Sequence, residues 1–128
     1  MAIENELDSV EAIAQHTKKF QKELNSGTVS LVLLSILDQA NTPLYGYEIT
    51  KKLQHNKDGK QGAIYPVLRN LHARNLINCD VKISESGPPR KYFTISILGK
   101  RVLQQWLVSW QATQSHVNNI ISGSFGNE

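Results

Sequence analysis

The segment Lys60–Leu98 reads KQGAIYPVLRNLHARNLINCDVKISESGPPRKYFTISIL and contains two different hydrophobic periods in succession. In its first part, apolar residues recur at helical spacing and form one face: Ile64, Val67, Leu68 and Leu71. Because proline is tolerated only near the first turn of a helix, Pro66 places the expected start of this helix close to Gly62. The opposite face is small, polar or basic and carries no carboxylate: Gly62, Pro66, Arg69, Asn70 and Ala73, with Gln61 and Tyr65 along its edge.

After Leu76–Ile77 the pattern changes to the alternation of a β-strand. One run contains Val81 and Ile83, and the second sets Tyr92, Thr94 and Ser96 against Phe93, Ile95 and Ile97. The residues between the runs, 85–90, have the composition of a turn, and Arg90 and Lys91 make the tip of the hairpin basic. A helix that can enter the major groove, followed by a basic hairpin, is the arrangement of a winged helix-turn-helix. The sequence therefore predicts a DNA-binding protein.

The distribution of charge supports this prediction. The net charge is only +3, but residues 51–75 hold six Lys and Arg against one acidic residue, Asp58. Residues 76–101 add five more against Asp80 and Glu85, whereas the last 27 residues contain neither Lys nor Arg. Such segregation is what neutralisation of DNA phosphates requires. The residues predicted to contact DNA are Tyr45, Tyr47, Lys51, Lys60, Gln61, Ala63, Tyr65, Arg69, Asn70, Arg90 and Lys91.

The rest of the chain is expected to be helical, which makes the fold α+β but mostly α. A first helix over 4–24 is expected to break at Asn25-Ser26-Gly27, followed by helices over 28–39 and about 45–54. A last helix is expected over about 97–121. The expected organisation is an N-terminal dimerisation helix (1–25), a winged-helix domain (26–97), a C-terminal dimerisation helix (98–121) and a flexible tail (122–128).

Two of these helices carry apolar stripes that lack a partner in a compact winged helix. The stripe of the last helix follows a three-to-four spacing with almost no charge. We therefore expect a homodimer whose interface contains Leu7, Val10, Phe20, Leu103, Leu107, Trp110, Val117 and Ile121.

Several other functions find little support in the sequence. Cys79 is the single cysteine, which excludes an intramolecular disulfide and a multi-cysteine zinc site. The four histidines show no metal-ligand spacing, and no nucleophile or phosphate-binding motif is present, so neither a metal, a cofactor nor an enzymatic activity is expected. The N-terminus lacks the basic region of a secretory signal, and a cytoplasmic location is expected.

The sequence resembles the PadR family of bacterial transcriptional regulators over about residues 23–121. The resemblance rests on LYGYEI at 44–49, GAIYPVLRNL at 62–71, Leu76-Ile77, and PRKYFTISILG at 89–99. It departs from the family where Phe93 replaces a second tyrosine, where Ile95-Ser96 replace a Leu-Thr pair, and at His72–Asn75, whose basic residues are expected to alter DNA contacts.

This resemblance implies a homodimer that represses transcription at a palindromic operator. It also implies, from many members, release of DNA when a small aromatic or lipophilic compound binds. In some small members a tryptophan of the C-terminal helix lines a cavity at the dimer interface, and Trp110 stands at the corresponding place.

Alternatives remain open for individual residues and for the whole chain. Tyr45, Tyr47 and Tyr65 either place a hydroxyl on a DNA phosphate or simply pack their rings. Trp106 and Trp110 either line a ligand site or fill the dimer core, and Cys79 is either a plain strand residue or a redox sensor. For the whole chain, the alternative is a winged helix that binds protein and does not bind an operator.

Overall fold

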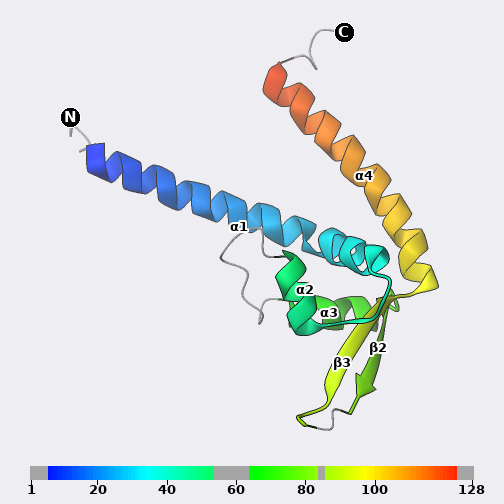
Figure 1. Ribbon diagram of the computed structural model, residues 1–128. Coiled ribbons are helices and arrows are strands. Elements are labelled where there is room, and N and C mark those ends of the chain that lie inside the picture. The colour runs from blue at the N-terminus through cyan, green and yellow to red at the C-terminus, as the bar shows by residue number, and fades with distance from the viewer. Residues whose placement is uncertain (1–5, 54–63, 84–85, 124–128) are drawn as a thin grey trace.

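The computed structural model describes residues 6–53, 64–83 and 86–123. The chain is mostly helical, with one small antiparallel sheet (Figure 1). In chain order the elements are α1 (Glu6–Gln39), β1 (Leu44–Tyr45), α2 (Gly46–Leu53), α3 (Tyr65–Ala73), β2 (Ile77–Lys82), β3 (Arg90–Ile95) and α4 (Ile97–Ser122). The two long helices, α1 and α4, diverge from a compact centre, and the β2–β3 hairpin extends from its opposite side (Figure 1). None of the helices in the described residues is long and apolar enough to cross a membrane.

The N-terminal helix is continuous, and the expected break at Asn25-Ser26-Gly27 is wrong. Side chains on either side of the expected break bond along α1 instead. Thr28 Oγ1 donates to the Leu24 carbonyl at 2.9 Å, and Gln21 Nε2 donates to Asn25 Oδ1 at 2.8 Å. A glycine inside a helix costs only about 1 kcal/mol relative to alanine, so Gly27 does not end it. The expected boundary between residues 25 and 26 thus falls inside one helix.

Only the C-terminal part of α1 belongs to the core. Leu33, Leu34 and Leu37 are buried there, whereas every residue from 10 to 27 is exposed. The core is completed by apolar residues from all the other elements and from the turns between them: Leu44, Ile49, Ile64, Leu68, Leu71, Leu76, Ile77, Phe93 and Leu103. The exposed half of α1 therefore projects away from the domain that holds it (Figure 1).

The sheet has the strand order β1-β3-β2. Leu44 pairs with Phe93, and both are buried. Because side chains alternate across a strand, the same register turns Tyr45 and its partner Tyr92 to the other face. The β2–β3 pairing runs from Ile77↔Ile95 to Lys82↔Arg90, so the expected hairpin is present. The helix expected from about Tyr45 begins at Gly46, because Leu44–Tyr45 forms the edge strand.

The helix α3 begins at Tyr65, which is later than the expected start near Gly62; residues 62 and 63 lie outside the described part of the chain. Pro66 occupies its first turn, as proline geometry requires. The helix buries Leu68 and Leu71 and ends at Ala73, with Arg74 as its C-cap. Asn75 then adopts a left-handed conformation, with φ 62°, which asparagine tolerates better than most residues.

The start of α4 is tied to this turn by Ser96. Its hydroxyl accepts a hydrogen bond from the Gly99 backbone N–H at 2.9 Å and donates one to the Asn75 carbonyl at 2.8 Å. A side chain at Gly99 would collide with the Leu76 carbonyl, so glycine allows the first turn of α4 to lie against Leu76, just before β2. The observed start at Ile97 and end at Ser122 agree with the helix expected over about 97–121.

Candidate nucleic-acid interface

The outer face of α3 is exposed as its sequence predicted. Pro66, Arg69, Asn70 and Ala73 are accessible to solvent, while the opposite side of the helix enters the core. Three other residues predicted to contact DNA, Lys60, Gln61 and Ala63, lie outside the described residues. The exposed face presents an arginine and an amide to solvent, and both groups can donate hydrogen bonds to phosphates or base edges.

Tyr65 packs against a partner that the sequence did not reveal. It is half-buried, and its hydroxyl lies against Gly46 at the start of α2, where any added Cβ would collide with it. Gly46 therefore allows the N-terminal ends of α2 and α3 to approach closely. This contact accounts for the position of the Tyr65 ring without DNA, and its predicted phosphate contact stays a prediction.

The N-terminus of α2 already has an acidic partner. The Glu48 carboxylate accepts a hydrogen bond from the Tyr45 backbone N–H at 3.2 Å, and Glu48 lies in the first turn of the helix. A carboxylate at this place uses part of the attraction that a helix N-terminus has for anions. Any phosphate contact by α2 thus depends on side chains such as Tyr47 and Lys51, both of which are exposed.

Aromatic rings and basic side chains alternate from α2 to the hairpin. The Tyr45 ring stacks on Tyr47, with a centroid separation of 6.2 Å, and meets Tyr92 edge-on at 5.5 Å. A cation lies over each ring: Lys51 over Tyr47 at 4.9 Å, Arg90 over Tyr45 at 4.7 Å, and Lys82 over Tyr92 at 4.9 Å. We call these six residues the tyrosine–cation row.

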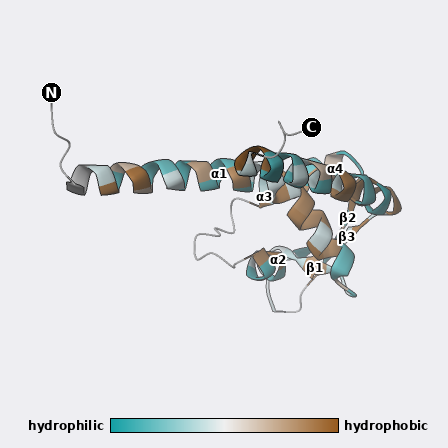
Figure 2. Cartoon of the chain, turned by 90° about the horizontal axis from the view of Figure 1, so that it is seen from above, coloured by the Kyte–Doolittle hydropathy of each residue, from teal (hydrophilic) through white to brown (hydrophobic). Residues whose placement is uncertain are grey.

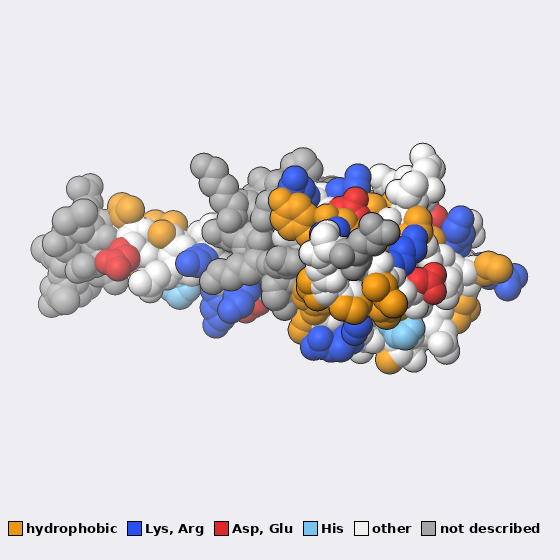
Figure 3. Space-filling view, turned by 60° about the horizontal axis from the view of Figure 1, so that its bottom comes forward, with side chains coloured by type: hydrophobic (Ala, Val, Ile, Leu, Met, Phe, Trp, Pro, Cys, Tyr) orange, Lys and Arg blue, Asp and Glu red, His pale blue; other side chains and the backbone are white. Residues whose placement is uncertain are grey.

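Viewed from the hairpin side, the molecule shows Lys and Arg side chains next to hydrophobic ones (Figure 3). Four members of the tyrosine–cation row were predicted from the sequence to contact DNA, but Lys82 and Tyr92 were missed. The alternation of the hairpin contained the necessary signal, because it places Tyr92 on the same face as Arg90. Lys91, by contrast, is exposed on the other face of the strand.

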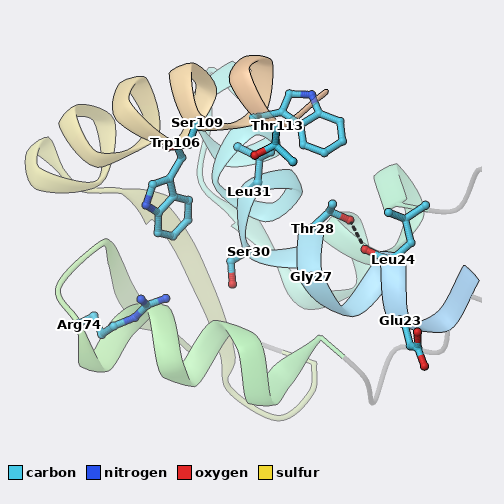
Figure 4. A pocket seen from close by; sticks show the side chains of 11 residues that line it. Glu23, Leu24, Gly27, Thr28, Ser30, Leu31, Arg74, Trp106, Ser109 and Thr113 are labelled. Carbon is cyan, nitrogen blue, oxygen red and sulfur yellow. Dashed lines mark hydrogen bonds between the residues drawn. The ribbon is translucent and has the colours of Figure 1, made fainter. Parts of the chain in front are cut away.

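A second feature is a cavity of about 590 Å³ between α1 and α4 (Figure 4). It is lined by Glu23, Leu24, Gly27, Thr28, Ser30, Leu31, Arg74, Trp106, Ser109, Trp110 and Thr113. The two tryptophans predicted to form a ligand site are thus brought to one cavity. Trp106 points from α4 toward Arg74, whose guanidinium carbon lies 5.8 Å from the ring centroid. Arg74 was expected to alter DNA contacts, but its side chain faces this cavity.

The stripe predicted for a dimer interface is only partly available. Val10, Phe20, Leu107, Val117 and Ile121 are exposed large apolar residues, and apolar segments recur along α1 and α4 (Figure 2). Leu103 was assigned to the interface wrongly: it is 4% exposed and belongs to the core of its own chain, because the first turns of α4 pack on that core. Trp110 is half-buried, and the side chain of Leu7 lies outside the described part.

The element order, the three-stranded sheet and the exposed basic helix and hairpin define a winged helix-turn-helix protein. Residues 33–105 match the PadR-like family of transcriptional regulators. The chain belongs to this family, so it is a DNA-binding transcriptional regulator and not an enzyme.

Solved structures with the same fold support this assignment. A PadR-like transcriptional regulator from Bacillus cereus is 32% identical, with a TM-score of 0.65 over 77% of this chain and 96% of its own. A PadR family regulator from Eggerthella lenta is 27% identical, with a TM-score of 0.77 over 87% of this chain and 96% of its own. In a comparison of sequences alone, an uncharacterized protein from Lysinibacillus sphaericus is 26% identical over 73% of this chain and 87% of its own.

Proposed function

We propose that this regulator is a homodimeric repressor that binds a palindromic operator and is released from it by a planar aromatic or lipophilic compound. The observation that carries the proposal is the separation of two surfaces. The hairpin lies on one side of the compact centre, and the exposed halves of α1 and α4 extend on the other (Figure 1). One side suits DNA, and the other suits a second copy of the chain.

The DNA-binding part of the proposal rests on exposed charge. Arg69 projects from α3, and Lys91 projects from β3, with no acidic residue in either element. In this arrangement α3 reads the major groove and the hairpin contacts the backbone or the minor groove beside it. Phosphate contacts would set the register on the duplex, and Arg69 and Asn70 would reach base edges.

The proposal of a dimer is supported by the exposed apolar side chains of α1 and α4. Val10 and Phe20 on α1 are 65% and 60% exposed, and Ile121 on α4 is 77% exposed. Monomeric soluble proteins rarely expose contiguous apolar patches of large area, and residues 10–27 of α1 are all exposed in the described part of the chain. A second copy, packed by a two-fold axis, would cover both helices at once.

The proposal of an effector is supported by the cavity between these same helices. Trp106 and Trp110 line it, and Arg74, which caps the end of α3, lies over the Trp106 ring. A ligand stacked on the tryptophans would therefore touch both the dimer helices and the end of the DNA-reading helix. It shifts DNA affinity only if it prefers one spacing of the two α3 helices. Titration of tryptophan fluorescence with planar aromatic compounds, with and without DNA, tests this part, and quenching without loss of DNA affinity would contradict it.

The proposal is tested by isolating the fragments of its own genome that the purified protein retains, and by measuring binding to them as salt is varied. Arg69→Ala and Lys91→Ala should each weaken binding and flatten the log–log salt slope by about 0.9 for each DNA phosphate that the variant no longer neutralises. Arg101→Ala, which removes the same charge from an exposed position on α4, is the control and should bind like the wild type.

Failure takes two distinct forms in this experiment. Retention of no duplex by the wild type would favour a winged helix that binds protein. Wild-type binding by both Arg69→Ala and Lys91→Ala would show that another surface contacts the DNA.

A further inference from the structure

The end of the β2–β3 hairpin places two like charges directly opposite each other. Lys82 pairs with Arg90 in the register of the strands. Cations at directly paired positions repel each other and destabilise a hairpin. An arrangement of this kind needs either a compensating contact within the chain or a use outside it.

Each of the two cations lies over a tyrosine ring. Arg90 lies 4.7 Å from the centroid of Tyr45, and Lys82 lies 4.9 Å from that of Tyr92. The rings are themselves paired across β1 and β3 and meet edge-on at 5.5 Å. Because the negative face of an aromatic ring attracts a cation, the two rings hold the two charges apart in separate places.

The two rings and the two cations differ in their exposure to solvent. Both rings are half-buried, whereas Arg90 and Lys82 are exposed. Long basic side chains can lay their apolar stems on such rings while their charged ends stay in water. The charges are thus restrained and yet accessible to a partner.

We propose that Tyr45 and Tyr92 are positioning residues that hold Arg90 and Lys82 as a preformed pair of contacts for two DNA phosphates. This inference rests on the proposed function and specifies how the hairpin contacts the backbone. Ordering long side chains at an interface costs binding free energy, and a side chain already ordered in the free protein avoids part of that cost. Two neighbouring phosphates also remove the repulsion between the paired cations.

The decisive variant removes a ring and no charge. Tyr45→Leu should weaken operator binding roughly 2- to 10-fold, because an unrestrained Arg90 must be ordered during binding and then neutralises its phosphate in only part of the complexes. It should also flatten the log–log salt slope by up to about 0.9, although its net charge is unchanged. The bond from the Tyr45 backbone N–H to Glu48 does not involve the tyrosine side chain, so the start of α2 should be retained, and thermal unfolding checks this.

Two further variants separate the ring from its hydroxyl and from other roles. Tyr45→Phe keeps the ring and should retain wild-type affinity and slope; an equal reduction in Tyr45→Phe and Tyr45→Leu would mean that the hydroxyl itself contacts DNA and would overturn the inference. In the presence of Arg90→Gln, Tyr45→Leu should have almost no further effect. Additive reductions in affinity would also overturn it, because the ring would then act independently of Arg90.

The same test is available at the second pair if Tyr45→Leu does not fold. Tyr92→Leu, alone and with Lys82→Gln, should reproduce both the flatter slope and the lack of additivity. If a folded ring variant keeps the wild-type salt slope on DNA that Arg69→Ala binds more weakly, this inference is overturned but the proposed function is not. Absence of duplex binding by the wild type would overturn the proposed function together with it.

Discussion

At the scale of single residues, two glycines in helices have opposite roles. Gly46 begins α2 directly beneath the Tyr65 hydroxyl, whereas a Cβ at Gly27 in α1 would meet no described atom within 4 Å beyond its chain neighbours and the adjacent helix backbone. The contact at Gly46 joins the two helices of the helix-turn-helix, so its size controls their relative position. The sequence showed both residues but not this difference, since the close approach depends on where α3 packs.

The two glycines give a matched pair of substitutions to alanine. Gly46→Ala should destabilise the protein by about 1–3 kcal/mol, because the added methyl displaces the Tyr65 ring. Gly27→Ala should stabilise it by about 0.5–1 kcal/mol, because alanine loses less conformational freedom in a helix. Chemical denaturation of both variants measures these changes. Equal stabilisation by the two would show that Tyr65 does not pack on Gly46.

At the scale of elements, the strong hydrophobic periods were predictable and the weak local signals were not. The β2–β3 hairpin and α4 follow long, regular patterns. The hairpin is present and α4 has nearly its expected bounds, but β3 spans Arg90–Ile95, whereas the expected alternation continued to Ile97. The break at 25–27 was inferred from helix-ending residue types, whose side chains instead bond along α1.

For the candidate site, too, some features could be predicted from the sequence and others could not. The exposed face of α3 follows from its period, but its contacts with other elements do not. The place of Arg74 beside Trp106, and of Leu103 in the core, depends on how α3, α1 and α4 meet in three dimensions. Periodicity shows that a face is apolar and leaves open whether its own chain or a second copy covers it.

The exposed end of α4 allows a direct test of the dimer. Replacing both Val117 and Ile121 with glutamate should raise the dissociation constant of the dimer at least about 100-fold, because burial of each such side chain contributes roughly 1.5–3 kcal/mol. Light scattering against concentration measures this change. Ser115→Glu with Asn119→Glu has the same spacing on the opposite side of the helix and should remain dimeric. A wild-type protein that is monomeric at all micromolar concentrations would exclude the dimer.

At the scale of the whole molecule, the long helices would determine how far apart two α3 helices lie in the proposed dimer. Since α1 is continuous, its exposed half extends as one helix from the core that also holds α3 (Figure 1). A two-fold dimer must present both α3 helices to one side of the duplex, with half-sites about 34 Å apart, one helical turn. Any change in the angle between α1 and α4 would alter this spacing, which is how a ligand between them would act.

The most direct test of one dimer on two half-sites changes the DNA and leaves the protein intact. In a retained operator, insertion of about five base pairs between the half-sites turns them to opposite sides of the duplex, whereas about ten base pairs returns them to the same side. We expect the first insertion to abolish the tight complex of one dimer with both half-sites. The second insertion should return both half-sites to the same side of the duplex but leave them farther apart, so that binding recovers only in part. Unchanged affinity after the five-base-pair insertion, measured by mobility shift at fixed salt, would contradict the claim that one rigid dimer binds both half-sites.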